Sequence, residues 1–163
     1  MLTLRFSRLT ALALLISLTA PLAAAEDVAF GTARQDPQQP VEVSADNLTV
    51  SQKDGTATFS GNVMITQGDM ILNAPSVLVV YKEENKKISR LEASGGITLV
   101  SGPDAAEAQS AEYDIDAGTV LLLGSVLLSQ GTNVMSGDRI TINLDAGTAQ
   151  VGGRVKTTLQ PKD

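Results

Sequence analysis

The side chains that most often carry chemistry in proteins are scarce in this sequence of 163 residues, which contains no histidine and no cysteine. Without them a Ser-His-Asp triad, a Cys-His pair or a histidine-based metal site cannot be built. The 18 aspartates and glutamates could form a carboxylate pair, but most stand in turns or at the polar points of alternating segments. We therefore expect solvated carboxylates, no catalytic residue, no metal and no cofactor, and we predict that the protein is not an enzyme.

The first 25 residues have the pattern of a cleaved secretory signal. Arg5 and Arg8 form a positive start, residues 9–18 form an apolar stretch, and the alanines at 23–25 offer a cleavage site before Glu26. An uncleaved membrane anchor is the alternative, but the stretch is shorter than the roughly 20 apolar residues that a span needs. We expect an exported protein.

The exported chain would be strongly acidic. Of the 12 basic residues, Arg5 and Arg8 leave with the signal, whereas all 18 acidic residues stay. Such a chain has no electrostatic footprint for nucleic acid or for an anionic membrane surface. Because it also lacks cysteine, it must be held together by core burial and not by disulfides.

Composition divides the chain into four parts. Residues 1–25 are the expected signal, and residues 26–40 are polar with two prolines, which is typical of a flexible leader. Residues 41–160 form one domain, and residues 161–163 are a tail. Within the domain, segments such as 56–60, 138–144 and 154–159 alternate polar and apolar residues, which indicates short strands.

An internal repeat organises the domain. A turn with the pattern Asp-Gly or Asp-Ala-Gly at residues 54–55, 116–118 and 145–147 is followed by a strand and then by a second glycine at 61, 124 and 153. The first glycine suits a tight hairpin turn, and the second permits a corner or bulge. Gly95 begins a weaker copy, and the segments 63–68 and 126–131 resemble each other. We predict an all-β fold, an open twisted jelly roll of about 14–16 short antiparallel strands with an interior of Val, Ile and Leu.

Several segments in a fixed order resemble the OstA-like family of periplasmic lipopolysaccharide-transport proteins. The resemblance covers roughly residues 40–159. It is carried by Gln-Pro-Val-Glu-Val-Ser-Ala-Asp at 39–46, Phe-Ser-Gly-Asn-Val at 59–63, Gln-Gly at 67–68, Ser-Ala-Glu-Tyr-Asp-Ile at 110–115 before Gly124, and Gly-Asp-Arg-Ile-Thr at 137–141.

The resemblance implies a function in outer-membrane biogenesis. A protein of this kind binds lipopolysaccharide in the periplasm and holds the acyl chains of its lipid A part in an apolar groove. Its partners are further copies of itself, paired head to tail into an oligomer, and jelly-roll domains of an LptC-like inner-membrane protein and an LptD-like outer-membrane protein. Together they bridge the two membranes.

The resemblance also implies which residues line the groove. Position by position, these are Val41, Val43, Leu99, Tyr113 and Ile115. Phe59, Val63 and Ile65 are expected in the core or as further groove lining. Plain core packing is the alternative for each of them, because groove and core are one surface in this fold.

Three other functions stay open. The chain could be a membrane-anchored, LptC-like sister component of the same machine, which an uncleaved N-terminus would indicate. It could be a structural β-roll assembly module without lipid cargo, since a fold does not imply a function. A carbohydrate-active enzyme would need two inward-facing carboxylates, whereas the alternation places apolar residues inside.

Overall fold

The structure, a computed structural model, describes residues 27–31 and 39–159, and within them it consists of strands, turns and short connections. None of the described residues belongs to a helix of the length and apolarity that a membrane crossing requires. The strands are β1 (Asp27–Ala29), β2 (Glu42–Ser44), β3 (Asn47–Ser51), β4 (Thr56–Gln67), β5 (Met70–Tyr81), β6 (Ile88–Ser101), β7 (Asp104–Asp114), β8 (Thr119–Gln130), β9 (Asn133–Asn143), β10 (Thr148–Gly152) and β11 (Lys156–Thr158).

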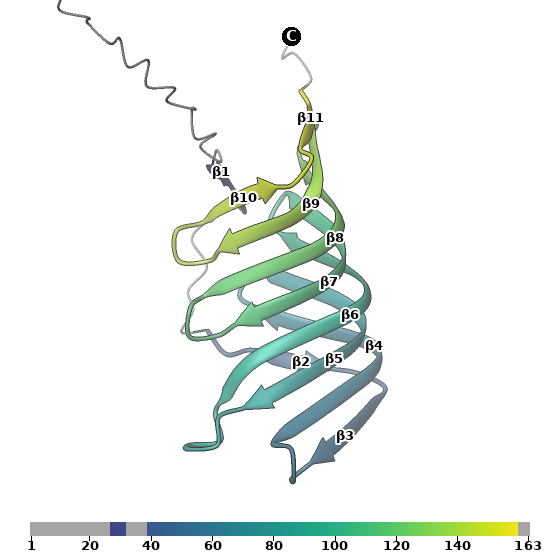
Figure 1. The fold of residues 1–163 in the computed structure, drawn as a ribbon, viewed down its shortest axis with the longest axis vertical. Coiled ribbons are helices and arrows are strands. Elements are labelled where there is room, and N and C mark those ends of the chain that lie inside the picture. Colours follow the sequence, from purple (N-terminus) through teal and green to yellow (C-terminus); the bar gives the residue numbers. More distant parts are fainter. Residues whose placement is uncertain (1–26, 32–38, 160–163) are drawn as a thin grey trace, which may run out of the picture.

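All eleven strands belong to one antiparallel sheet that is rolled on itself (Figure 1). Its order is β1-β10-β9-β8-β7-β6-β5-β4-β2, so the long strands from β4 to β9 each pair with the next one in sequence. β2 and β3 both pair with β4 at one end, and β10 and β11 both pair with β9 at the other. One end of the roll therefore terminates in the short strands β2 and β3, and the other in β11 and in β1, which pairs with the outer side of β10.

The roll is formed by a line of bends across the long strands. The pairing registers shift at Ser60/Val63 in β4 and at Leu123/Val126 in β8, and the strands between them shift at matching places. Gly61 and Gly124 have φ angles of 79° and 84° at these bends, a backbone conformation that favours glycine. The second glycine of the repeat is thus a bulge, as the sequence predicts.

The expectation of about 14–16 strands is wrong for the described residues, which form eleven. The six strands from β4 to β9 contain 11 to 14 residues each, because their hydrogen-bonded ladders continue on both sides of the bend. The higher number follows from taking each second glycine of the repeat as the end of one strand and the start of another. The all-β jelly-roll architecture itself is confirmed.

The predicted hairpin turns are present, and side chains at the ends of the preceding strands stabilise them. Gly118 and Gly147 have φ angles of 58° and 64° in these turns. The turn amides of Ala117 and Ala146 donate hydrogen bonds to the side chains of Asp114 (2.9 Å) and Asn143 (2.8 Å), the last residues of the preceding strands. Asp116 and Asp145, the aspartates inside the repeat, are not the acceptors in these two bonds.

A strand lies in the segment that we expected to be a flexible leader. β1 pairs with β10, and Phe30, which follows it, is 4% exposed and belongs to the core. The expectation of a flexible leader over residues 26–40 is therefore wrong for residues 27–31. The expected signal at 1–25 and the tail at 161–163 lie outside the described residues.

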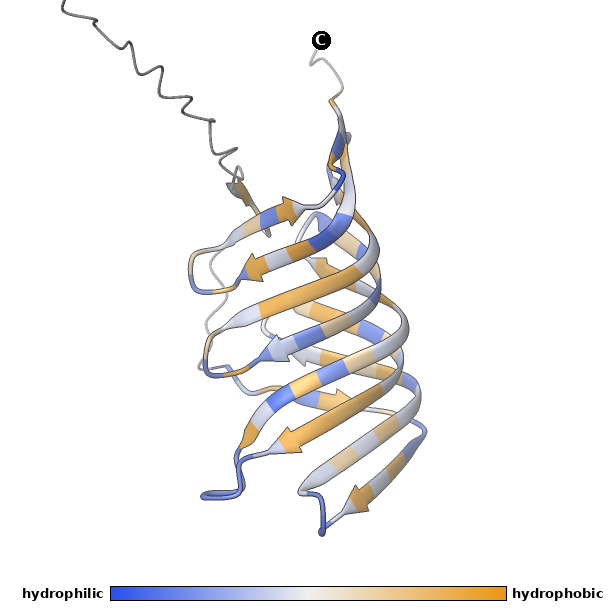
Figure 2. Ribbon diagram, in the orientation of Figure 1, coloured by the Kyte–Doolittle hydropathy of each residue, from blue (hydrophilic) through white to orange (hydrophobic). Residues whose placement is uncertain are grey.

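The interior of the roll is aliphatic. The bends divide the long strands into two halves, which form two facing walls of the roll. Period-two alternation places the apolar side chains of both walls inside and the polar ones outside, and Figure 2 shows this alternation along the strands. Leu99, Leu122, Leu128 and Ile140 have no exposed surface. Removing this apolar surface from water is the main source of stability for a chain without disulfides.

Candidate functional site

The two walls of the roll meet along a line that we call the seam. The first lip of the seam is formed by the turns at residues 52–55, 82–87, 115–118 and 144–147, and the second lip by those at 68–69, 102–103 and 131–132. The antiparallel order puts each set of turns at one end of the long strands. Hydrogen bonds and apolar contacts join the lips, so the seam is the line along which the interior could open.

Two of the predicted groove residues lie deep in the interior. Leu99 in β6 has no exposed surface, and it is opposite Leu72 and Ala106 in the sheet. Tyr113 in β7 is 3% exposed and is opposite Leu91 and Val120. Both contribute to the packed core of this structure, so a lipid chain could contact them only after the walls move apart.

Two other predicted groove residues come together at the seam. Val41 and Ile115 are partly buried against the core, and they line a pocket of about 580 Å³ with Pro40 and Ile88. The remaining residues that line this pocket are Lys82, Lys86, Lys87 and Asp116. The pocket is therefore an apolar hollow with a mainly cationic rim, and Lys82 forms an ion pair with Asp116 across it.

The remaining predicted residues lie on β2 and β4. Val43 is partly buried and is opposite Ile65, which is itself buried. Val63 is buried as well, whereas Phe59 is partly buried beside Leu48 of β3. These residues extend the interior surface from the seam towards the end of the roll at β3.

A polar bridge crosses the interior close to the seam. The Tyr113 hydroxyl donates a 2.6 Å hydrogen bond to Oε1 of Gln67, and Nε2 of Gln67 donates a 3.0 Å bond to the carbonyl of Gln39. Burial raises the pKa of Tyr113, and the bond to Gln67 opposes part of that rise. The bridge links β7, β4 and the segment before β2, so it ties the two lips together.

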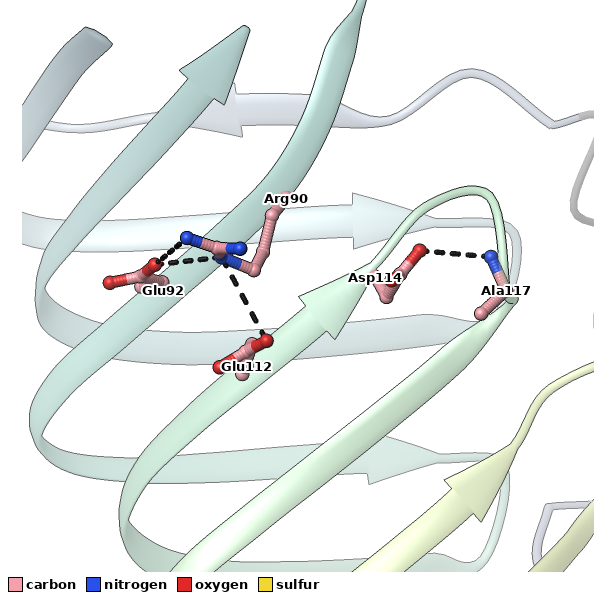
Figure 3. A network of polar contacts seen from close by, with 5 residues as sticks. All are labelled: Arg90, Glu92, Glu112, Asp114 and Ala117. Carbon is pink, nitrogen blue, oxygen red and sulfur yellow. Dashed lines mark hydrogen bonds and ion pairs between the residues drawn. The ribbon is translucent and has the colours of Figure 1, made fainter. Parts of the chain in front are cut away.

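The charged residues on the outer face form a separate cluster (Figure 3). Arg90 in β6 pairs with Glu92 at 2.7 Å and with Glu112 in β7 at 3.8 Å, and these side chains are 40–49% exposed. Glu92 raises the pKa of Arg90. Exposed ion pairs of this kind contribute little to the stability of the fold. Among the described residues, no group of acidic side chains is arranged to hold a metal ion.

Sequence reasoning missed the role of two glutamines. Gln67 and Gln130 occupy the same place in the two similar segments 63–68 and 126–131. Each donates its amide hydrogen to a backbone carbonyl of the N-terminal segment, Gln67 to Gln39 and Gln130 to Ala29. The Gln-Gly pair that ends both similar segments was the sequence feature that could have indicated a shared role for these glutamines.

The fold and its interior define a class of protein: an open-ended β-jelly roll with an aliphatic interior and a seam along one side. A family model described as "LptA/(LptD N-terminal domain) LPS transport protein" matches residues 42–148. The chain belongs to this family.

Relatives from several bacteria resemble the chain over most of its length. It is 34% identical to the "Uncharacterized protein R00383" of Rhizobium meliloti over 135 residues, which are 76% of this chain and 73% of that protein. It is 28% identical to the "Lipopolysaccharide export system protein LptA" of Escherichia coli K12 over 162 residues, 92% of this chain and 86% of that one.

A solved structure has the same fold. The LptH protein of Pseudomonas aeruginosa, described as "the LptA homologous periplasmic component of the conserved lipopolysaccharide transport device", superposes with a TM-score of 0.69. The superposition covers 78% of this chain and 99% of LptH at 21% sequence identity. At that identity the likeness establishes the jelly-roll fold.

Proposed function

We propose that this protein binds lipopolysaccharide in the periplasm through the acyl chains of lipid A and carries it within a bridge between the inner and outer membranes. The observation that supports this most is the aliphatic interior, which reaches the surface at the seam pocket beside Val41 and Ile115. The proposed role is transport by binding, not catalysis, in keeping with the family.

The interior suits acyl chains because it is apolar and unspecific. Each methylene moved from water into such surroundings contributes about 0.8 kcal/mol. The side chains fill the roll in this structure, so the lips would separate and the acyl chains would replace side-chain contacts with one another. The three lysines at the seam pocket would then lie where an anionic head group leaves the interior.

The ends of the roll suit addition of strands from like domains. The outer edges of β2 and β3 at one end, and of β11 and the three-residue β1 at the other, have no partner strand among the described residues. Leu48 and Val50 in β3 are 56% and 61% exposed. Such edges pair readily with another chain, and a head-to-tail contact that does not close grows into a filament. We propose copies of this chain and LptC-like and LptD-like domains as the partners.

Site-specific photo-crosslinking in cells tests the proposed lipid path. A photoreactive residue at Val43 or Tyr113, which face the interior, should form adducts with lipopolysaccharide. Glu42 and Glu112 are neighbours of these residues in β2 and β7 and face outward, so they are the matched controls and should give no lipid adduct.

Adducts with protein alone at Val43 and Tyr113 would contradict lipid transport and favour a structural assembly module. N-terminal sequencing of the exported protein distinguishes the membrane-anchored alternative. A chain that begins near residue 26 supports a free periplasmic protein, and one that begins at Met1 supports an anchored component.

A further inference from the structure

The N-terminal segment lies on the edge and the seam that assembly would use. β1 pairs with three of the five residues of β10, the edge half-strand at the C-terminal end of the roll: Asp27 with Gln150, Val28 with Ala149 and Ala29 with Thr148. β10 is therefore covered by the chain's own strand, whereas β11 beside it has no such cover among the described residues.

Residues 29–31 then cross the seam from one lip to the other. The Phe30 amide donates a 3.0 Å hydrogen bond to the carbonyl of Gly147 on the first lip. The Gly31 amide donates a 2.7 Å bond to Oδ2 of Asp104, the first residue of β7, which follows the turn 102–103 of the second lip. Phe30 itself enters the core between these two contacts.

The second lip has side chains that fit this crossing. Gln130 donates its amide hydrogen to the carbonyl of Ala29 and to Oδ2 of Asp104, the latter at 3.1 Å. Asp104 is 7% exposed, so its carboxylate is buried with these donors around it. A Cβ on Gly31 would lie 2.5 Å from Oγ of Ser101, and the φ angle of Gly31 is 81°, so any other residue here would be strained and would push against Ser101.

A second contact to the N-terminal part of the chain lies beside another turn of the second lip, at residues 68–69. Gln67, the counterpart of Gln130 in the internal repeat, binds the carbonyl of Gln39. Two equivalent positions of the repeat thus bind the backbone at two points of one N-terminal segment. Recognition through a backbone carbonyl, a bound amide and an aromatic anchor is how a sheet edge accepts an extended peptide.

We propose that residues 27–31 form an intramolecular strap over the β10 edge, and that a strand from a second copy of this chain must displace the strap to join there. This inference rests on the proposed function in taking β10 and β11 as a joining edge. The strap sets how readily copies assemble, because only the fraction of molecules with a free β10 edge can accept a partner.

The proposal is tested by locking and by loosening the strap. The double variant Ala29→Cys/Thr148→Cys places one thiol on each strand of a paired position, in a protein that has no other cysteine. The oxidised protein should stay monomeric at concentrations where its reduced form and the wild type associate, as measured by sedimentation velocity. The single variant Ala29→Cys, blocked with iodoacetamide, is the control for the substitution.

Gly31→Ala should loosen the strap without touching β10. If the strap covers the edge about nine-tenths of the time, Gly31→Ala lowers the dissociation constant of self-association by up to about tenfold. Gly96→Ala is the matched control, since Gly96 in β6 also has a positive φ angle, 91°, and no atom near its missing Cβ, and it belongs neither to the strap nor to the strands and turns that hold it. It should leave the dissociation constant unchanged.

Binding of purified lipopolysaccharide, followed in the same samples by native mass spectrometry, separates this proposal from the proposed function. If the oxidised and reduced forms associate equally, or if Gly31→Ala associates less, the strap is wrong even where lipid binds. If the wild type, the reduced form and Gly31→Ala all stay monomeric, the strap is also wrong. If association follows the prediction and no sample binds lipopolysaccharide, the result supports the strap proposal and contradicts the proposed lipid-binding function.

Discussion

At the scale of single residues, the Tyr113–Gln67 bridge is a polar link among aliphatic side chains. A hydrogen bond of this kind contributes about 1 kcal/mol to folding. Its position near the seam means that the same bond which stabilises the closed roll would have to break when the lips separate. Tyr113 is therefore expected to affect both stability and the ease of opening.

The bridge predicts a pH-dependent loss of stability. Because the folded pKa of Tyr113 is raised above its unfolded value, its contribution is fully present below about pH 10 and is lost as the pH rises through the folded pKa. Tyr113→Phe should lower the free energy of unfolding by about 1 kcal/mol at neutral pH. The deficit should vanish at a pH above the folded pKa of Tyr113.

Urea unfolding of wild type and Tyr113→Phe at both pH values measures this difference. Tyr81→Phe is the control, since Tyr81 is a partly buried tyrosine at the end of β5, a strand that β6 separates from β7. An equal deficit for Tyr113→Phe at the two pH values would show that the hydroxyl is not buried in the bridge.

The candidate site could be predicted only in part from the sequence. The family resemblance led to Val41 and Ile115, and these two residues do share the seam pocket. Whether they contact lipid stays a prediction. Gln67 was missed because a glutamine at an inward position looks, in sequence, like one more polar residue before a turn. Its partner carbonyl at Gln39 is 28 residues away, a contact that only the rolled sheet creates.

At the scale of elements, the line of bends decides the shape of the molecule. Each bulge turns its strand sharply while the ladder continues on either side, so six long strands form two walls in place of one flat sheet. The close approach at Gly124 shows how tight the bend is. A Cβ there would lie 2.7 Å from Oε1 and 2.9 Å from Cβ of Gln109 in the neighbouring strand.

Gly124→Ala should therefore destabilise the fold more than Gly131→Ala. Both substitutions place alanine at a positive φ angle, which costs about 1–2 kcal/mol, but only Gly124→Ala adds a clash with Gln109. Urea unfolding midpoints at an unchanged slope measure the two losses. Equal losses would mean that the bend has room for a side chain, against the close approach of Gln109 to Gly124.

The repeat predicted the elements well where glycine and aspartate mark a change of direction. Turns and bulges occur at the expected places because these positions need positive φ angles, as at Gly118 and Gly124. Strand length was not predictable in the same way, since the pattern does not tell whether pairing continues past a bulge. β1 was missed because a three-residue strand has too little alternation to stand out, and its stability comes from β10 and the seam.

At the scale of the whole molecule, the roll combines an aliphatic interior, a seam and two half-strand edges. One end has two free half-strands, β2 and β3, and the other has β11 free and β10 covered by β1, within the part of the chain that the structure describes. This asymmetry would give a chain of copies a direction. The interior of each copy would continue into the next only when the β10 edge and the seam beside it are released.

We propose that the interior holds the acyl chains of lipopolysaccharide and not its sugars. Native mass spectrometry of the purified protein with intact lipopolysaccharide and with the same material after complete deacylation tests this most directly. We predict a complex with the intact lipid and binding at least about tenfold weaker for the deacylated form, because the lost methylenes supply the apolar contribution. Equal binding of both forms would contradict acyl-chain recognition by the interior.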